Sequence, residues 1–278
     1  MQNLCLHTHN FFCDGKASIQ QMVESAVNQG VTQIGISSHA PLKIPNKWSM
    51  SINDLENYRM EILLAGRKYR EEIAVFLSLE IDYIPGFTYE FDFFRDKLKL
   101  DYTIGSIHLV KHPETNELWF IDGDKKTSIQ NMQRVFNGDV RAALSAYFGQ
   151  TREMIRTQKP DIIGHLDKAV MNLGHLFDVE EVWYQEEITE TLELVKKYNC
   201  IVEANTRGLY KGKWQDTFPS KSILTQCYHM GIPVVISSDA HRTTELLANY
   251  ETARQILRGI GYTQQMARAK TGWIAVDL

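Results

Sequence analysis

Seven short apolar runs restrict the folds that this chain can adopt. Each is rich in Ile, Val, Leu or Tyr, and a longer segment separates it from the next run. This composition is typical of strands that are buried on both faces, as in a parallel sheet. The runs are "LCLHTH", "QIGISSH", "AVFLSLEID", "YTIGSIH", "DIIGHLD", "CIVEANT" and "PVVISSDAH".

The intervening segments carry helical patterns with recognisable ends. In the first of them, Ser18 and Gln21 form a capping-box pattern, and Gly30 follows the last expected turn. Strand and helix alternate along the whole sequence, which predicts a (β/α) barrel or a doubly wound sheet. No composition break or repeat divides the chain, so we expect one domain over residues 1–278. The predicted helical regions are 19–30, 51–72, 127–158, 179–199, 220–231 and 244–261.

Composition excludes several classes of protein. The formal charge is −4, and 44% of the residues are hydrophobic, which is ordinary for a globular chain that forms its own core. No basic stripe suggests a nucleic-acid partner, and no run is long enough to cross a membrane. The four cysteines form no C-x-x-C pair, and the first ten residues lack a signal-peptide pattern. We therefore expect a cytoplasmic protein with free thiols.

Metal-binding residue types occur where the apolar runs end. In a parallel barrel the carboxyl ends of all strands open on one face, so groups far apart in sequence meet there. The alternation of side chains along a strand puts His7 and His9 on one side, and Asp239 and His241 repeat that spacing. The candidate ligands are His7, His9, Asp14, His39, Glu80, His108, His165, Asp239 and His241.

This set of imidazoles and carboxylates suits Zn²⁺, Mn²⁺ or Fe²⁺. Nine ligands are too many for one ion and fit two or three. Buried histidines and carboxylates would be costly without partners, so packing alone does not account for the pattern. Several clustered ions with a bridging carboxylate are a common device for phosphoester hydrolysis.

The motifs also resemble those of a known family, the PHP (polymerase and histidinol phosphatase) superfamily. They appear in the family's order over residues 7 to about 245. Within the family, "FCDG", "GHLDK" and "NTRGLYK…FPS" are most similar to stand-alone histidinol-phosphate phosphatases. The motifs are "HTHNFFCDG", "SSHAP", "LEID", "GSIH", "GHLDK", "EANTRG" and "SSDAH".

The resemblance implies a single-domain, distorted (β/α)7 TIM-like barrel with a trinuclear metal site at the carboxyl ends of its strands. It implies hydrolysis of L-histidinol phosphate to L-histidinol and phosphate, a step of histidine biosynthesis. By motif, His7, His9, Glu80 and Asp239 hold the first ion, and Glu80 bridges to a second ion held by His108 and His165. Asp14, His39 and His241 hold the third. The expected catalytic residues are Glu80, Asp14, Asp239 and His241.

A phosphate monoester also needs positive charge beyond the metals. Arg207 is the first candidate, because it lies at a strand end and its guanidinium matches a phosphate. Lys168 is the second and Lys211 the third. The stretch 111–127 is expected to cover the pocket, and Asp122, Asp124, Trp119 and Tyr210 are open candidates for recognising the alcohol.

Three alternatives stay open. The amidohydrolase barrel also begins with H-x-H, but the glutamate after run three and the late D-x-H disfavour it. A PHP phosphoesterase for a sugar phosphate, nucleotide or phosphotyrosine has the same ligands. A non-catalytic metal-binding PHP module, of the kind attached to polymerases, is the third. The sequence leaves the oligomeric state open.

Overall fold

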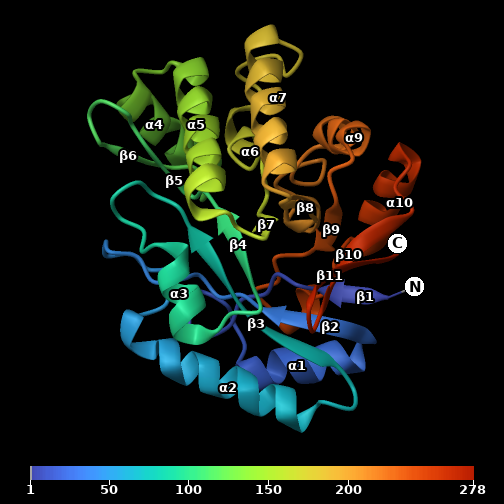
Figure 1. Ribbon diagram of the computed structural model, residues 1–278. Helices are drawn as coiled ribbons and strands as arrows, with labels where there is room; N and C mark the ends of the chain where they lie inside the picture. The colour runs from blue at the N-terminus through green and yellow to red at the C-terminus, as the bar shows by residue number, and fades with distance from the viewer. Residues whose placement is uncertain (1) are drawn as a thin grey trace.

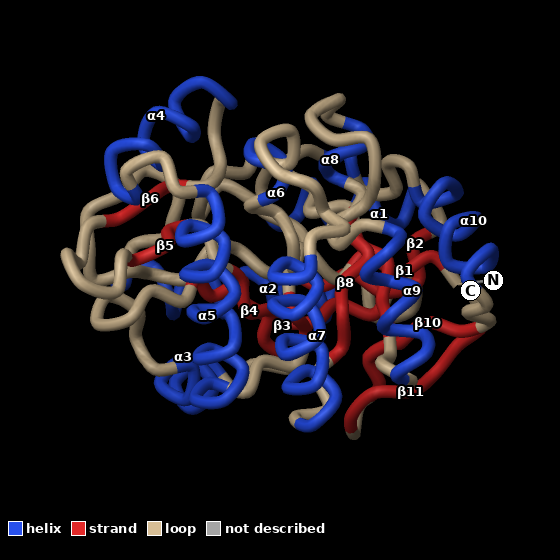
Figure 2. The backbone as a smooth tube through the Cα atoms, turned by 90° about the horizontal axis from the view of Figure 1, so that it is seen from above, coloured by secondary structure: helices blue, strands red, loops and turns tan. Residues whose placement is uncertain are grey.

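Seven parallel strands form the centre of the protein, whose computed structural model describes residues 2–278 (Figures 1 and 2). Their order in the sheet is β1-β2-β3-β4-β7-β8-β9. A parallel bridge between Thr8 and Ala240 links the two edge strands just beyond their ends, so the sheet is a nearly closed barrel. This confirms the barrel prediction over the doubly wound alternative. The strands are β1 (Asn3–Cys5), β2 (Val31–Ile36), β3 (Ala74–Asp82), β4 (Tyr102–Ser106), β7 (Ile162–Ile163), β8 (Ile201–Asn205) and β9 (Val234–Ser237).

Helices surround the strands, as Figure 2 shows from above. The first follows the sequence prediction closely: the Ser18 hydroxyl accepts a hydrogen bond from the Gln21 backbone, and the Gln21 side chain accepts one from the Ser18 backbone. Gly30 then has a φ of +70°, which ends the segment. The helices are α1 (Ile19–Asn28), α2 (Leu55–Lys68), α3 (Phe91–Leu98), α4 (Lys125–Phe136), α5 (Val140–Gln158), α6 (Val170–Leu173), α7 (Val182–Lys197), α8 (Arg207–Tyr210), α9 (Lys221–Met230) and α10 (Tyr250–Ile260), with the 3₁₀ turns η1 (Ile52–Asp54) and η2 (Thr243–Glu245).

Two hydrophobic clusters lie on opposite sides of the strands. The larger one fills the space between strands and helices. The smaller one fills the barrel interior near the beginnings of the strands, and Ala267 joins it from a C-terminal hairpin of β10 (Gln264–Ala269) and β11 (Gly272–Asp277). The hairpin thus packs against the amino-terminal end of the barrel and leaves the carboxyl end to polar residues. The interior residues are Leu4, Leu6, Tyr102, Ile104, Ile162, Ile201, Val235 and Ala267.

One glycine, Gly35, allows strand β2 to pack closely against this interior. A Cβ atom on Gly35 would lie 1.6 Å from the Tyr102 hydroxyl oxygen and 2.9 Å from the Leu6 carbonyl oxygen. The fully buried hydroxyl of Tyr102 donates a hydrogen bond to that carbonyl. Strand β2 can therefore approach the aromatic ring only because residue 35 lacks a side chain.

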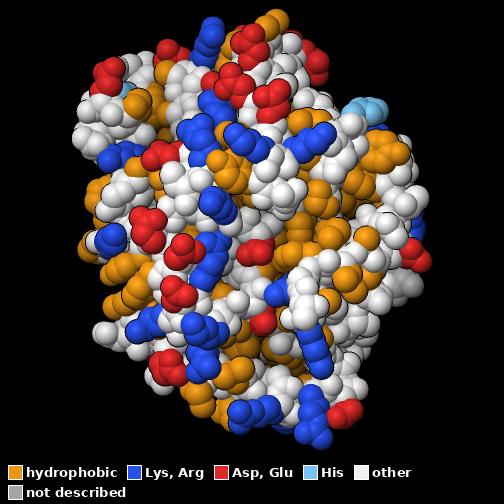
Figure 3. Space-filling model, viewed as in Figure 1, with side chains coloured by type: hydrophobic (Ala, Val, Ile, Leu, Met, Phe, Trp, Pro, Cys, Tyr) orange, Lys and Arg blue, Asp and Glu red, His pale blue; other side chains and the backbone are white. Residues whose placement is uncertain are grey.

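The structure differs from the predicted elements in several places, among them the C-terminal hairpin of β10 and β11, which was not expected. Region 127–158 is two helices, because Asn137 and Gly138 both have a positive φ between α4 and α5. Helix α3 was not expected, nor was the hairpin of β5 (Leu109–Lys111) and β6 (Leu118–Phe120), which is inserted after β4. Within residues 2–278, no helix has the length and apolar content that a membrane span requires. Acidic and basic side chains are interspersed over the face seen in Figure 3.

Candidate metal centre

The nine predicted ligands form one continuous cluster at the carboxyl end of the barrel. Residues that are 230 positions apart in the sequence touch there: His9 Nε2 lies 3.1 Å from Asp239 Oδ1. Eight of the nine are buried, and the Asp14 side chain is 34% exposed at the cluster's outer edge. The nine are His7, His9, Asp14, His39, Glu80, His108, His165, Asp239 and His241.

Several potential ligand atoms in this cluster are buried and make no hydrogen bond to any described residue, and four of them lie close together. They are Nε2 of His7, Nε2 of His9, Oε2 of Glu80 and Oδ1 of Asp239. The His7 atom lies 3.3 Å from the Glu80 oxygen and 3.9 Å from the Asp239 oxygen. The His9 atom lies 3.5 Å and 3.1 Å from the same two oxygens. Neighbouring ligand atoms around a tetrahedral ion with bonds of about 2.0–2.1 Å are roughly 3.3–3.4 Å apart. The atoms of His7, His9 and Asp239 all lie within 4.8 Å of one another, with Glu80 Oε2 next to both imidazoles, so this group can hold a divalent cation, which would remove the cost of leaving them unpaired.

Glu80 divides its two carboxylate oxygens between neighbouring groups of histidines. Oε2 faces His7, His9 and His39. Oε1 lies 3.0 Å from Nε2 of His165 and 3.8 Å from Nε2 of His108. One carboxylate in this position can bridge two cations.

A further group gathers around Asp14. Its Oδ1 atom lies 3.2 Å from Nε2 of His241 and 3.8 Å from Nε2 of His39, and it makes no hydrogen bond to a described residue. With His9, these side chains form a set whose donor atoms all lie within 4.8 Å of one another. The cluster can thus hold more than one divalent ion.

Glu203 orients His7 from behind. Its Oε2 atom lies 2.7 Å from Nδ1 of His7, and both side chains are fully buried. Because the carboxylate accepts the proton on Nδ1, the lone pair of His7 is left on Nε2, the nitrogen that faces the candidate ion. The Asn205 amide donates to the other oxygen of Glu203. Glu203 and Asn205 lie at the end of the sixth apolar run with the same i, i+2 spacing as His7 and His9, a usable signal, but no role was predicted for them.

Charge in the cluster shifts the pKa of its groups. Burial alone would lower the pKa of His7, but Glu203 and the other carboxylates raise it well above normal, so a bound cation would have to displace a proton from this ring. Burial alone would raise the pKa of the Glu80 carboxyl, but the surrounding imidazoles, His39 most strongly, hold that pKa well below its usual range. Burial would also raise the pKa of Asp239, but Arg207 is the largest of several charges that hold it well below normal. Burial and neighbouring imidazoles lower the pKa of His9, so this ring stays neutral, the form that binds metals.

The backbone is strained at two of the candidate ligands. His165 has a φ of +24° and Asp239 has a φ of +52°, a region that side-chain-bearing residues rarely adopt. Strain of this kind persists where the surrounding structure holds a residue in place, and it is concentrated at functional sites. Both residues lie two positions after the end of a strand, where the chain turns and brings the side chain into the cluster.

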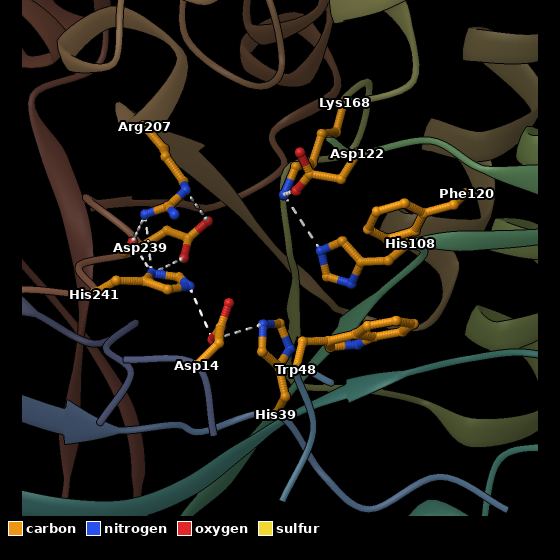
Figure 4. A pocket seen from close by; sticks show the side chains of 10 residues that line it. All are labelled: Asp14, His39, Trp48, His108, Phe120, Asp122, Lys168, Arg207, Asp239 and His241. Carbon is orange, nitrogen blue, oxygen red and sulfur yellow. Dashed lines mark hydrogen bonds and ion pairs between the residues drawn. The ribbon is translucent and has the colours of Figure 1, made fainter. Parts of the chain in front are cut away.

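A small pocket opens beside the cluster (Figure 4). Two of the predicted phosphate-binding residues line it, Arg207 and Lys168. Arg207 Nη1 donates to the Asp239 carbonyl oxygen over 2.7 Å, which holds the guanidinium beside the cluster. The third, Lys211, is absent from the lining, and its ammonium pairs with Glu245. A substrate contact for Lys211 stays a prediction.

Lys168 is a buried cation held against the cluster. Its Nζ atom lies 2.9 Å from Oδ2 of Asp122 and 3.3 Å from Nε2 of His108. Burial alone would lower the pKa of Lys168, but Asp122 and the more distant carboxylates outweigh it and raise that pKa above normal. The pocket therefore combines a permanently charged ammonium with a guanidinium, both suited to an anionic ligand.

Of the four open candidates for recognising the alcohol, only Asp122 lines the pocket. Asp124 caps α4 by accepting a hydrogen bond from the Thr127 backbone. Trp119 is fully buried with its indole N–H bonded to the Ser128 carbonyl, and Tyr210 contacts Arg207 from behind. The expectation for residues 111–127 is confirmed in that Phe120 and Asp122 both line the pocket.

Trp48, from the segment after β2, also lines the pocket and was not predicted, since nothing in the sequence links it to the strand ends.

Comparisons with known proteins agree with this arrangement. The sequence model of the PHP domain family matches residues 5–207. The chain is 26% identical to the histidinol-phosphatase of Bacillus subtilis strain 168 over 267 residues, which cover 90% of this chain and 98% of that protein.

Two solved structures share the fold. A crystal structure assigned as histidinol phosphatase HisK of Listeria monocytogenes has a TM-score of 0.78 and 25% identity, covering 90% of this chain and 99% of that one. Histidinol phosphate phosphatase of Lactococcus lactis, crystallised with zinc, L-histidinol and phosphate, has a TM-score of 0.71 and 17% identity, covering 98% and 99%. The second likeness shows the fold alone.

Proposed function

Since the chain belongs to the PHP domain family, whose members include metal-dependent phosphoesterases, we propose that it hydrolyses L-histidinol phosphate to L-histidinol and phosphate. The convergence of nine metal-binding side chains beside two cations, the buried Lys168 and the partly exposed Arg207, carries this proposal. The histidinol-phosphatase relatives support the choice of substrate, because they match this chain over most of their length.

The proposal assigns the ligands to two or three divalent ions, zinc, manganese or iron. His7, His9, Glu80 and Asp239 would hold the first. The second would share Glu80 with His108 and His165, as the division of the carboxylate oxygens suggests. The third would be held by Asp14, His39 and His241.

Bound at these side chains, the ions would supply Lewis-acid activation and positive charge for phosphoryl transfer. The chain's own cations complete the charge. Arg207 is fixed by the Asp239 carbonyl and by the Tyr210 hydroxyl, so its guanidinium is already oriented before a phosphate arrives. Lys168 is fixed by Asp122 in the same way. Glu80, Asp14, Asp239 and His241 are our candidates for the catalytic step, since each lies where ligand groups meet.

A phosphoester panel tests this function. The protein would be stripped with a chelator, reloaded with Mn²⁺, Zn²⁺ or Fe²⁺, and assayed with L-histidinol phosphate, a sugar phosphate, a nucleotide and phosphotyrosine. We expect activity only after reloading, with kcat/KM for L-histidinol phosphate at least about tenfold above the other esters. Reloaded protein that cleaves none of them would contradict the phosphatase assignment. A preference for another ester would contradict the substrate assignment only.

A further inference from the structure

An aromatic wall forms one side of the pocket. Trp48 and Phe120 come from segments that are far apart in sequence, yet their rings stack with centroids 5.3 Å apart and planes inclined by 23°. Figure 4 shows the two rings together on one side, with Arg207, Asp239 and His241 on the other. Trp48 comes from the segment after β2, and Phe120 ends β6 of the inserted hairpin.

The two rings are the only apolar side chains among the residues that line this pocket. The remaining lining consists of carboxylates, imidazoles, Lys168 and Arg207. A phosphate ester has a charged end and an organic end, and the polar side of the pocket suits only the first. The organic end must then lie against the rings or in solvent.

The nearby carboxylate does not compete for this role. Asp122 lies two residues beyond Phe120, but its Oδ2 atom is paired with Lys168 at 2.9 Å, and its Oδ1 atom lies 3.9 Å from Lys213. These two ammonium groups offset its charge, so it is a weak site for a cationic ligand. Recognition by ring contact is what the pocket offers.

Trp48 gives a second indication of a missing contact. Its indole N–H is buried and has no hydrogen-bond partner among residues 2–278. Buried polar groups are nearly always paired, so this donor points to a group supplied from outside the chain. Because the N–H lies in the plane of the indole, an acceptor would meet it at the edge of the ring, whereas the face of the ring stays available for stacking.

We propose that Trp48 and Phe120 bind the alcohol part of the substrate and select phosphate monoesters whose alcohol carries a planar aromatic ring. This inference rests on the proposed phosphatase function. Aromatic rings gain from stacking beyond the area they bury, whereas a short aliphatic alcohol offers little surface to either ring. The ester bond would lie between the wall and the cluster, with the ring of the alcohol parallel to Trp48 or Phe120.

The test compares kcat/KM for 2-phenylethyl phosphate and glycerol 3-phosphate, which are both esters of primary alcohols and differ in whether the alcohol carries an aromatic ring. We expect the wild-type protein to prefer 2-phenylethyl phosphate, and Trp48→Ala or Phe120→Ala to reduce the ratio of the two kcat/KM values about tenfold. Trp48→Phe keeps a ring but lacks the N–H, and it should retain most of the ratio. Phe93→Ala removes an exposed ring on α3 and should leave the ratio unchanged.

Binding of non-hydrolysable phosphonates separates recognition from chemistry. The same alanine variants should weaken binding of phenylphosphonate relative to methylphosphonate, with metal content and melting temperature close to wild type. If an alanine variant does not fold, the kcat/KM ratios of the wild type and of Trp48→Phe still test the inference. Equal kcat/KM values for the two esters in the wild type would overturn it. A folded alanine variant whose kcat/KM falls by the same factor for both esters would also overturn it.

Failure of the proposed function gives a different result. Metal-loaded wild-type protein that cleaves neither ester refutes the phosphatase assignment, and the aromatic preference is refuted with it. Protein that cleaves both esters equally well refutes only the aromatic preference.

Discussion

Replacing Glu203 with glutamine should weaken metal binding without removing a metal ligand. Glu203 contacts His7 at 2.7 Å, and no other carboxylate lies within ion-pair distance of His7 Nδ1 among the described residues. Glutamine keeps the shape of the side chain but loses its charge. The Nδ1 proton of His7 is then held less firmly, and the ring is a poorer electron donor at Nε2.

The expected size of the effect follows from the kind of contact. The hydrogen bond is short, charge-assisted and fully buried, and such bonds contribute about 1.5–3 kcal/mol. Loss of an outer partner of a metal-bound histidine typically reduces affinity about 10- to 100-fold, or roughly 1.4–2.7 kcal/mol. The two ranges agree, so we expect the dissociation constant of the tightest ion to rise about 10- to 100-fold.

The assay is a competition titration of stripped protein against a chelator of known affinity, with bound metal measured by mass spectrometry. Asp101→Asn is the matched control, because Asp101 accepts a hydrogen bond from the Leu77 backbone at the opposite end of the barrel. That variant should bind metal like the wild type. A Glu203→Gln dissociation constant within twofold of wild type, in a protein with a normal melting temperature, would refute the orienting role.

Four further outcomes are expected. Glu80→Gln should abolish turnover and lower the number of bound ions in elemental analysis; full activity would rule out the bridging role. Arg207→Ala should raise KM and lower kcat/KM for the phosphoester about 100-fold in steady-state assays, and unchanged kinetics would remove it from the site. Gly35→Ala should lower the free energy of unfolding by about 1–3 kcal/mol in urea titrations, because its Cβ would overlap the Tyr102 hydroxyl, and an unchanged midpoint would show that the strands can shift. Chelation should lower the melting temperature and added metal should restore it, because a ligand that binds only the folded state stabilises that state. A melting temperature that is the same with and without metal would argue against these sites.

The sequence pattern predicted parallel strands and the cluster, because both depend on the apolar runs and their ends, whereas the choice of a seven-stranded barrel over a doubly wound sheet came from the family resemblance. A buried parallel strand can be recognised as a short apolar run. The residue that follows it lies at the carboxyl end of the sheet, independently of the length and sequence of the helix that comes next. His7 and Asp239 could therefore be grouped although their separation is 232 positions, and they lie 3.9 Å apart.

Features that depend on packing between distant segments were not predictable in this way. Strand β10 of the C-terminal hairpin carries polar residues such as Gln264 and Arg268, so its apolar pattern is weak. Trp48 lies in a segment without regular structure, and its place in the pocket depends on the stack with Phe120. Glu203 was visible at a strand end, but its contact with His7 requires the barrel to close.

A crystal structure of protein grown with Mn²⁺ or Zn²⁺, with anomalous difference maps at the metal edge, tests the central claim most directly. The account predicts two or three anomalous peaks inside the cluster, one bonded to Nε2 of His7, Nε2 of His9 and Oδ1 of Asp239, with Glu80 bonded to two of the peaks. Maps without a peak among these side chains, at metal concentrations that support activity, would contradict it.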